Sequence, residues 1–180
     1  MKRNANTARQ QSGFSLVESL LGVAITSLAL GAGLPGFEAA KEKRHLDGSA
    51  AQLETDIQLA RSEAVKLRHT LRLTFATSSA GSCYVVHTGK ATDCSCTADG
   101  NSSCKSNATA YRAAGFKAGG DLQMSSNVTS IVFDPVQGTI TPTGTFRFMG
   151  PKRNEVRVVV SIMGRARLCT PTRVPGYTAC

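Results

Sequence analysis

Residues 14–34 constrain this chain more than any other segment, because these 21 residues contain a single charged side chain, Glu18. About 20 apolar residues are what a helix needs to cross a bilayer. A carboxylate at the centre of such a helix costs about 2.5–3.5 kcal/mol on insertion scales, so an acid in the segment indicates a functional role and a partner. The sequence therefore predicts a membrane-associated helix with one functional acid.

The segment before the apolar run is a short basic leader, residues 1–13, that contains three basic residues and no acid. A secretory signal would place an A-x-A-like cleavage site after the apolar core, and residues 31–35 approximate one only loosely. An uncleaved anchor with an incidental glutamate is a second interpretation. A third interpretation comes from a family resemblance.

Residues 13–18 read GFSLVE and resemble the processing site of type IV prepilins. The resemblance implies that a prepilin peptidase cleaves after Gly13 on the cytoplasmic side, that the new N-terminus at Phe14 is methylated, and that the apolar helix is retained. It also implies that Glu18 pairs with the N-terminal amine of a neighbouring pilin subunit during assembly. A buried charge pair of this kind fixes register more reliably than it adds stability. We therefore expect a single-pass inner-membrane protein with a periplasmic globular part, which later joins a filament at the cell surface.

An amphipathic pattern follows the anchor. Apolar residues alternate spacings of four and three, which places them on one stripe of a helix: Leu46, Ala50, Leu53, Ile57, Ala60, Ala64, Leu67 and Leu71. Charged residues mark the opposite face, namely Lys43, Arg44, Asp47, Glu54 and Arg61. Because small residues let a helix lie close to a sheet, whereas a coiled coil prefers larger ones, the stripe is predicted to pack on the domain's own sheet. The charged face is predicted to be solvated or to face other subunits.

After residue 71 the period changes to two. Short β-branched or aromatic segments at 71–75, 83–87, 131–133, 145–148 and 156–160 are predicted strands. Turns at 150–154 and 163–164 join the last of them into consecutive hairpins. The fold class is therefore α+β, a long N-terminal helix packed on a small antiparallel β-rich globular domain. The expected segments are a cleaved leader (1–13), a transmembrane and assembly helix (14–35), an amphipathic helix (36–72) and the globular domain (73–180).

All six cysteines lie beyond residue 82, which fits a disulfide-forming compartment. Cys169 and Cys180 enclose a short C-terminal loop, and a bridge there would hold Arg173 near the last hairpin. The other four are expected to form two bridges without a strained Cys94–Cys96 pair: Cys83, Cys94, Cys96 and Cys104. A zinc site made from these four and His87 is the alternative, which loose spacing and an oxidising compartment disfavour. No metal and no cofactor are predicted.

The sequence contains no recognisable catalytic motif. The three histidines, His45, His69 and His87, lie beside no nucleophile motif, and no glycine-rich loop is followed by the Lys and Ser or Thr of a phosphate cradle. We therefore predict no catalytic residues and a protein that is not an enzyme.

Both ends of the globular part carry a second resemblance. Residues 59–66 (LARSEAVK) resemble a helix segment of the FimT and GspH group of minor pilins and pseudopilins, and residues 158–169 are similar to its C-terminal hairpin. The group's fold is a long N-terminal helix on a small β-rich domain. FimT-like proteins of transformable bacteria bind DNA through a Gly-Arg-x-Arg element, here residues 164–167. The resemblance thus implies a minor pilin that captures DNA for uptake in natural transformation.

The charge distribution supports this implication in part. The chain has 21 Lys and Arg residues against 12 acids, and residues 141–180 hold seven basic residues against Glu155 alone. Two arginines two apart on a strand project from one face, and paired guanidiniums suit phosphates. The candidate DNA-binding residues are Gly164, Arg165, Arg167, Arg173, Lys152 and Arg153. We expect sequence-independent binding to single or double strands with little base stacking, because Phe146 and Phe148 should face the core; a merely solvated strand face is the alternative.

Two other functions share these features. One is a GspH-like pseudopilin of type II secretion, a structural protein at a filament tip that needs no cationic surface. The other is an adhesive or assembly-priming minor pilin without DNA affinity, whose partner site would be the polar loop at 88–108.

Overall fold

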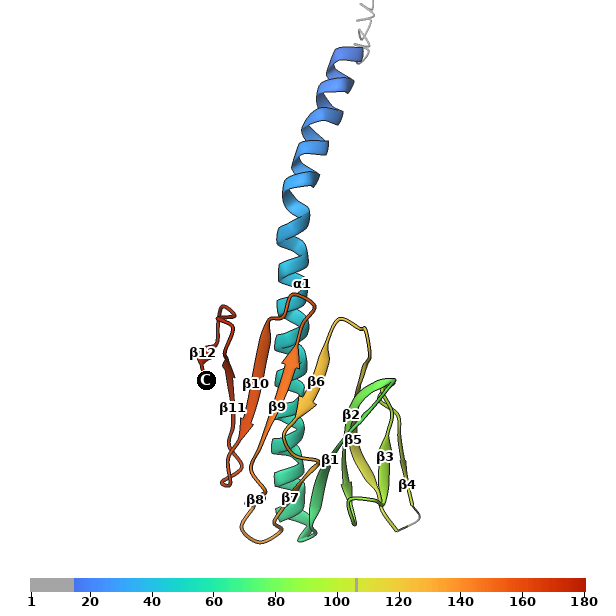
Figure 1. The fold of residues 1–180 in the computed structure, drawn as a ribbon, viewed down its shortest axis with the longest axis vertical. Coiled ribbons are helices and arrows are strands. Elements are labelled where there is room, and N and C mark those ends of the chain that lie inside the picture. Colours follow the sequence, from blue (N-terminus) through green and yellow to red (C-terminus); the bar gives the residue numbers. More distant parts are fainter. Residues whose placement is uncertain (1–14, 106) are drawn as a thin grey trace, which may run out of the picture. The chain divides into compact units, whose positions relative to one another are not determined.

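The computed structural model describes residues 15–105 and 107–180, without the side chains of residues 32–35. The predicted processing residues, Gly13 and Phe14, lie outside this part. The chain forms one helix, α1 (Leu16–Leu67), followed in the described part by twelve strands (Figure 1). These are β1 (Leu71–Ser78), β2 (Gly81–Thr88), β3 (Cys94–Cys96), β4 (Ser102–Cys104), β5 (Ala110–Lys117), β6 (Gln123–Ser126), β7 (Ser130–Phe133), β8 (Ile140–Thr141), β9 (Gly144–Met149), β10 (Glu155–Val160), β11 (Ala166–Thr170) and β12 (Thr178–Ala179).

The chain divides into two compact units, residues 1–40 and 41–180. The described part of the first unit is the beginning of α1, which is long and apolar enough to cross a membrane and buries none of its apolar window. Glu18 lies exposed in the first turn of this helix, where a negative charge is favoured by the helix dipole. The described part of the first unit therefore has the length and composition of a membrane-spanning helix, with its acid in the first turn.

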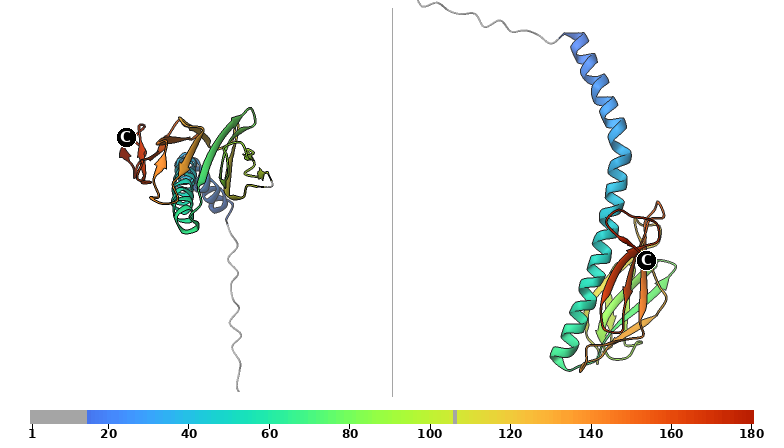
Figure 2. Two further views of the ribbon diagram at one scale, coloured as in Figure 1. Left: turned by 90° about the horizontal axis from the view of Figure 1, so that it is seen from below. Right: turned by 90° about the vertical axis from the view of Figure 1, so that its left-hand side faces the viewer.

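The second unit is built on the rest of α1, which lies along the strands (Figure 2). Six residues of the predicted stripe are completely buried against them: Leu46, Ala50, Leu53, Ile57, Ala60 and Ala64. They share one core with the inner residues of both large sheets, among them Leu73, Phe133 and Phe146. The prediction that the helix packs on its own domain is confirmed.

The helix ends earlier than the sequence indicated, at Leu67 rather than at residue 72. Arg68 adopts a left-handed conformation (φ 52°), and the backbone N–H of His69 donates to the Ala64 carbonyl at 3.1 Å. This is the hydrogen-bond pattern of a Schellman helix end. Leu67 is 48% exposed, whereas Leu71 is buried as the first residue of β1. Apolar spacing alone could not separate the last helical turn from the first strand residue.

Two five-stranded sheets enclose the core, in the orders β5-β2-β1-β7-β8 and β12-β11-β10-β9-β6. Strands β3 and β4 form a separate hairpin. Neighbouring strands pair antiparallel, except that β12 runs parallel to β11. The five predicted strands correspond to β1, β2, β7, β9 and β10, and the hairpins of the second sheet turn at the predicted places. Phe146 and Phe148 face the core, as predicted, so the alternate residues of β9 lie on the outer face.

Three disulfides engage all six cysteines: Cys83–Cys96, Cys94–Cys104 and Cys169–Cys180. The first of these ties β3 to β2, and the second joins β3 to β4. Residues 88–108, expected to be a loop, therefore contain a hairpin held by two bridges. With every thiol oxidised, the alternative zinc site loses its sulfur ligands.

Candidate nucleic-acid interface

Arginines gather on the outer face of the second sheet. Arg147 on β9 lies directly opposite Arg157 on β10, and Arg167 on β11 lies opposite Val159. Directly opposite residues of antiparallel strands share a face of the sheet. Arg147 and Arg157 were not among the predicted site residues, although the buried phenylalanines on either side of Arg147 already indicated that it points outward. These two arginines lie between the turn at residues 161–165 and the turn at residues 150–154, which carry other basic residues.

At one end of the face, residues 161–165 form the turn between β10 and β11. Arg165 lies in this turn, one residue before β11, rather than on the strand as predicted. The Ser161 N–H donates to the Arg165 carbonyl at 2.9 Å, which adds one more hydrogen bond to those that pair β10 with β11. Arg165 and Arg167 are therefore both exposed, with the partly buried Ala166 between them.

Gly164 fixes this turn to the helix. It has a φ of 76°, and a Cβ there would lie 2.8 Å from Cδ of Arg61. Its carbonyl accepts a hydrogen bond from Nε2 of Gln58 at 3.1 Å. Arg61, expected on the solvated face, instead donates from Nε to the Gly138 carbonyl at 2.8 Å. Gly164 thus acts by letting the turn approach α1 closely.

At the other end, the turn at residues 150–154 carries Lys152 and Arg153. Arg153 adopts a left-handed conformation (φ 62°), and its N–H donates to the Gly150 carbonyl at 3.0 Å. The N–H of Lys152 donates to Oε1 of Glu42 at 3.2 Å, and Glu42 is only 6% exposed. A Cβ on Gly150 would collide with the Glu42 carboxylate. This turn, too, is anchored to α1, and its two basic side chains remain at the surface.

Arg173 lies in the loop that the Cys169–Cys180 bridge closes. The Glu155 N–H donates to Oγ1 of Thr172 at 2.9 Å, which brings this loop beside the first residue of β10. Tyr177 donates from its hydroxyl to Oδ1 of Asp47 at 2.7 Å, and burial, together with this bond, raises the pKa of Tyr177. Since Glu155 directly follows the turn at 150–154, Arg173 is grouped with Lys152 and Arg153.

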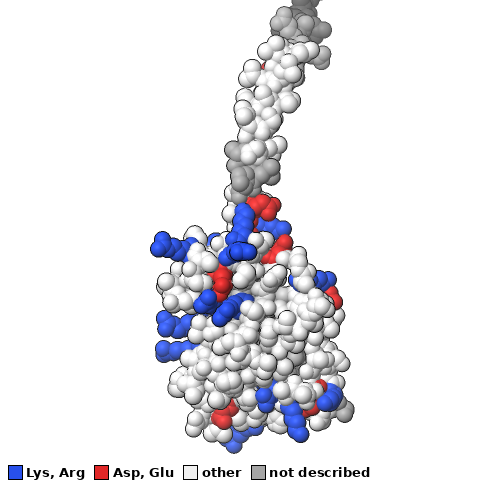
Figure 3. Space-filling model, viewed as in Figure 1, with Lys and Arg blue, Asp and Glu red and all other residues white. Residues whose placement is uncertain are grey.

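We call the following seven side chains the basic face: Arg147, Lys152, Arg153, Arg157, Arg165, Arg167 and Arg173. Arg157 pairs with Glu155, and the other six form no ion pair within residues 15–105 and 107–180. Elsewhere, Lys105 pairs with Asp93 and Lys117 with Asp99. Basic side chains project from the side of the molecule where β11 and β12 lie (Figure 3). The basic face is therefore strongly cationic.

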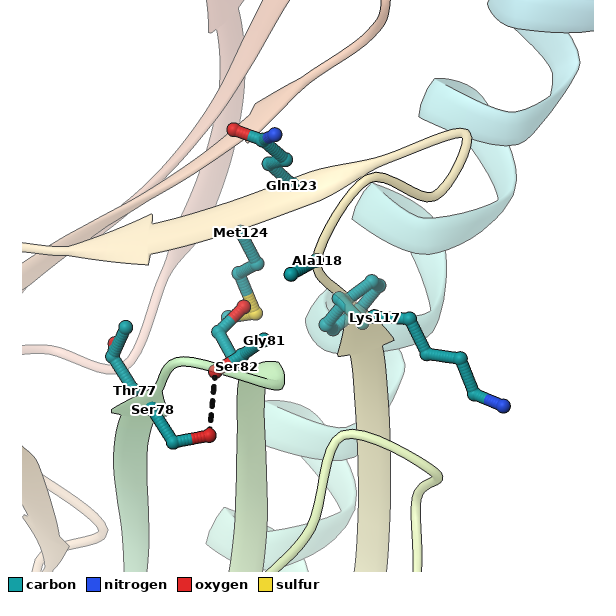
Figure 4. A pocket seen from close by; sticks show the side chains of 9 residues that line it. Thr77, Ser78, Gly81, Ser82, Lys117, Ala118, Gln123 and Met124 are labelled. Atoms are coloured by element: carbon teal, nitrogen blue, oxygen red, sulfur yellow. Dashed lines mark hydrogen bonds between the residues drawn. The ribbon is translucent and has the colours of Figure 1, made fainter.

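A pocket of about 200 Å³ opens elsewhere, between the β1–β2 turn, the end of β5 and β6 (Figure 4). Ser78, Ser82 and Met124 contribute to its lining, and the Lys117 side chain extends away from it toward its partner Asp99. Its nine lining residues include no histidine, cysteine or acid, so they form no acid–base pair. No group of three potential metal ligands occurs among the residues that the structure describes.

Two crystal forms of a type IV minor pilin share this fold. Type IV minor pilin FimU of Pseudomonas aeruginosa (strain PAO1) is 22% identical in one crystal form, with a TM-score of 0.53 over 76% of this chain and 96% of FimU. A second crystal form gives 20% identity and a TM-score of 0.51 over 73% and 98%. The minor pseudopilin EpsH of the Vibrio cholerae type 2 secretion system is 15% identical, with a TM-score of 0.49 over 70% and 97%.

The sequence itself identifies the family. No curated protein sequence matches the chain significantly. The family model described as type II transport protein GspH matches residues 49–164, which is more than half of the chain. This span contains most of α1 in the second unit and every strand up to β10. The chain therefore belongs to the family of type II transport protein GspH, with a type IV pilin-like fold.

Proposed function

We propose that this protein is a minor pilin of a type IV pilus that binds DNA through the basic face, for uptake in natural transformation. It acts in this proposal as a structural and binding protein rather than as an enzyme. The observation that carries the proposal is the group of six basic side chains on the outer face of the second sheet and in the turns and loop at its ends, none with an acidic partner among the described residues. A surface that only kept the protein soluble could mix acidic and basic side chains and would not need to group the basic ones.

The dimensions of the face suit a nucleic acid. The five residues of β11 separate Arg165 from the Arg173 loop by about 17 Å at the usual rise of a strand. Each strand of duplex DNA carries one phosphate per about 3.4 Å of helix axis, so this distance, laid along the axis, spans about five phosphates of one strand. Guanidinium and ammonium groups bind phosphates without reading bases, so binding should be independent of sequence and strongly dependent on salt.

Processing and location follow from the N-terminal motif. In this proposal, prepilin peptidase cleaves after Gly13, Phe14 is methylated, and Glu18 pairs with the N-terminal amine of a neighbouring subunit. The globular unit faces the periplasm before the protein enters a filament at the cell surface, and three disulfides are consistent with that oxidising compartment. Its partners are the other pilin subunits, the peptidase and DNA.

A salt titration tests the DNA proposal. Full-length protein in detergent is titrated with labelled duplexes of unrelated sequence at several salt concentrations. If Arg165 and Arg167 each neutralise one phosphate, the variant Arg165→Gln/Arg167→Gln should reduce the slope of log affinity against log salt by about 1.8, at about 0.9 per contact. The reduction should be the same for every duplex.

A charge-matched control is the variant Lys105→Gln/Lys117→Gln. Both lysines are well exposed, at 63% and 70%, but each is paired with an aspartate and lies outside the second sheet. This variant should keep the original slope. An unchanged slope in the arginine variant, with the fold retained, would show that the proposed contacts are wrong.

The family description favours a second candidate function, that of a type II secretion pseudopilin. This function requires filament assembly but no DNA affinity. An unmutated protein that binds no DNA at low salt, yet restores secretion when expressed in a secretion-deficient strain, would support it. An adhesive or priming role without DNA affinity would restore pilus assembly instead.

A further inference from the structure

We propose that Ile162 and Met163, in the turn between β10 and β11, form an apolar wedge that inserts between stacked base pairs of duplex DNA. Arg165 and Arg167 would hold the phosphates beside the insertion. This inference rests on the proposed DNA binding and adds a second kind of contact to it. It replaces the expectation of contacts to phosphates alone, because an inserted wedge unstacks and bends the duplex.

Both side chains of the wedge are exposed at the tip of a tight turn. The Gly164 N–H donates to the Ser161 carbonyl at 2.9 Å, so Ile162 and Met163 are the two central residues of this turn. Their exposed fractions are 53% and 61%, although Val160, just before the turn, is buried. One exposed apolar side chain is ordinary on a protein surface. Two in succession at a hairpin tip form a projecting apolar edge.

The backbone of the turn is held on two sides while these side chains stay free. The Ile140 N–H donates to the Ile162 carbonyl at 2.8 Å, which ties the turn to β8. Gln58 binds the Gly164 carbonyl from α1, and the Arg165 N–H donates to Oγ of Ser161 at 3.2 Å. A preorganised segment loses little conformational freedom on binding. The turn is therefore suited to inserting a side chain without first becoming ordered.

The wedge and the cations belong to one short segment, residues 162–167. Proteins that bend DNA combine cationic contacts to the backbone with Phe, Leu, Ile, Met or Pro side chains that partly unstack a base step. Here Arg165 follows Met163 by two residues, and Arg167 is exposed on the adjoining strand. Neither arginine forms an ion pair in the described part of the chain, so both are available to phosphates.

A neighbouring loop supplies a matched control. Val136, in the connection from β7 to β8, is 83% exposed. This loop adjoins the turn through Arg61, whose side chain approaches both Gly138 and Gly164. Val136 thus offers an exposed apolar side chain near the wedge but on a different loop.

The test uses the full-length protein in detergent and a duplex with 2-aminopurine at a central TA step, a flexible step that is easily unstacked. A pair of dyes at the duplex ends reports bending by energy transfer. The unmutated protein should increase the 2-aminopurine fluorescence and the energy transfer. The variant Ile162→Thr/Met163→Gln should lose both signals and bind about tenfold more weakly, because the apolar contacts of the inserted side chains with the unstacked bases are lost. Its salt slope should stay the same because both arginines remain.

Val136→Thr should keep both signals, and all variants should keep their melting temperature. If the unmutated protein binds DNA with the expected salt slope but gives neither signal, or if the double variant keeps both, the wedge is wrong while the proposed function stands. If the unmutated protein binds no DNA at low salt, both proposals are overturned. If the double variant loses only its association with other filament subunits, the turn is a subunit contact, and the wedge is also overturned.

Discussion

Replacing Gly164 with alanine should destabilise the second unit for two separable reasons. The first is conformational, because the residue has a φ of 76°, where an L-residue with a Cβ is strained by about 1 kcal/mol. The second is steric, because the new Cβ would lie 2.8 Å from Cδ and 2.9 Å from Nε of Arg61. The arginine side chain can move, but only by giving up its hydrogen bond to the Gly138 carbonyl.

The steric part can be given a magnitude. A hydrogen bond from a charged group contributes about 1.5–3 kcal/mol when buried, and the part-buried position of Arg61 reduces this to about 1 kcal/mol. Strain and steric cost together should lower the free energy of unfolding by about 2 kcal/mol. For a unit of this size, 1 kcal/mol shifts the melting temperature by about 3–4 °C, so the expected loss is about 6–8 °C.

Gly119 provides the control for strain alone. Its φ is 71°, and nothing lies within 4 Å of the position that its Cβ would take. Gly119→Ala should therefore cost only about half as much as Gly164→Ala, when both melting curves are followed by circular dichroism under the same conditions. In an Arg61→Ala background, which removes the obstructing side chain, Gly164→Ala should cost no more than Gly119→Ala does. Equal losses for the two glycine variants in the unmutated background would refute the packing role of Gly164.

Three further predictions concern the core and the tail. Burial lowers the pKa of His87 below its ordinary 6.5, so the unfolded state binds a proton first as the pH drops, and stability falls below about pH 6.5. The variant His87→Gln should therefore weaken the dependence of the melting temperature on pH between about pH 7 and 5. An unchanged pH profile would contradict this. Tyr84→Phe removes a 2.7 Å hydrogen bond to Oδ2 of Asp56 and leaves a buried carboxylate oxygen unpaired, which should cost about 1–3 kcal/mol in urea unfolding; an unshifted midpoint would argue against it. Cys169→Ser/Cys180→Ser should cost up to about 3 kcal/mol in the chain-entropy model, measured by calorimetry, and a melting temperature equal to the original would show that the loop is held without its bridge.

Local periodicity explains why so much of the fold was predictable. The stripe from Leu46 to Ala64 and the five predicted strands each show a regular pattern of apolar and polar residues within a short segment. Burial of apolar surface is the dominant favourable contribution to folding, so this pattern predicts the structure of each segment. The hairpin of β3 and β4 escaped prediction because residues 88–108 are polar and carry no alternating pattern. Two disulfides and strand pairing hold it instead, and neither leaves a periodic signal in the sequence.

The sequence predicted most of the charged residues of the candidate interface but not the contacts that orient them. Arg165 and Arg167 follow from a short motif, whereas the contacts that orient them join residues far apart in the chain. Gln58 lies 106 residues before Gly164, and Glu42 lies 110 residues before Lys152. Such pairs depend on how α1 packs across the second sheet, and a single sequence gives no sign of them.

The Gly-Arg-x-Arg element therefore combines two kinds of residue that the sequence did not distinguish. Gly164 is buried and bonded to α1, so it positions the turn, whereas Arg165 and Arg167 are exposed and carry the charge. The two roles should separate in a salt titration, because the slope counts neutralised phosphates, whereas the affinity at fixed salt also depends on where the charges stand. A displaced turn weakens binding with little change of slope, whereas a lost arginine changes both. Grouping the glycine with the arginines as a DNA contact, as the motif alone suggested, would therefore assign a binding role to a residue whose effect comes from packing.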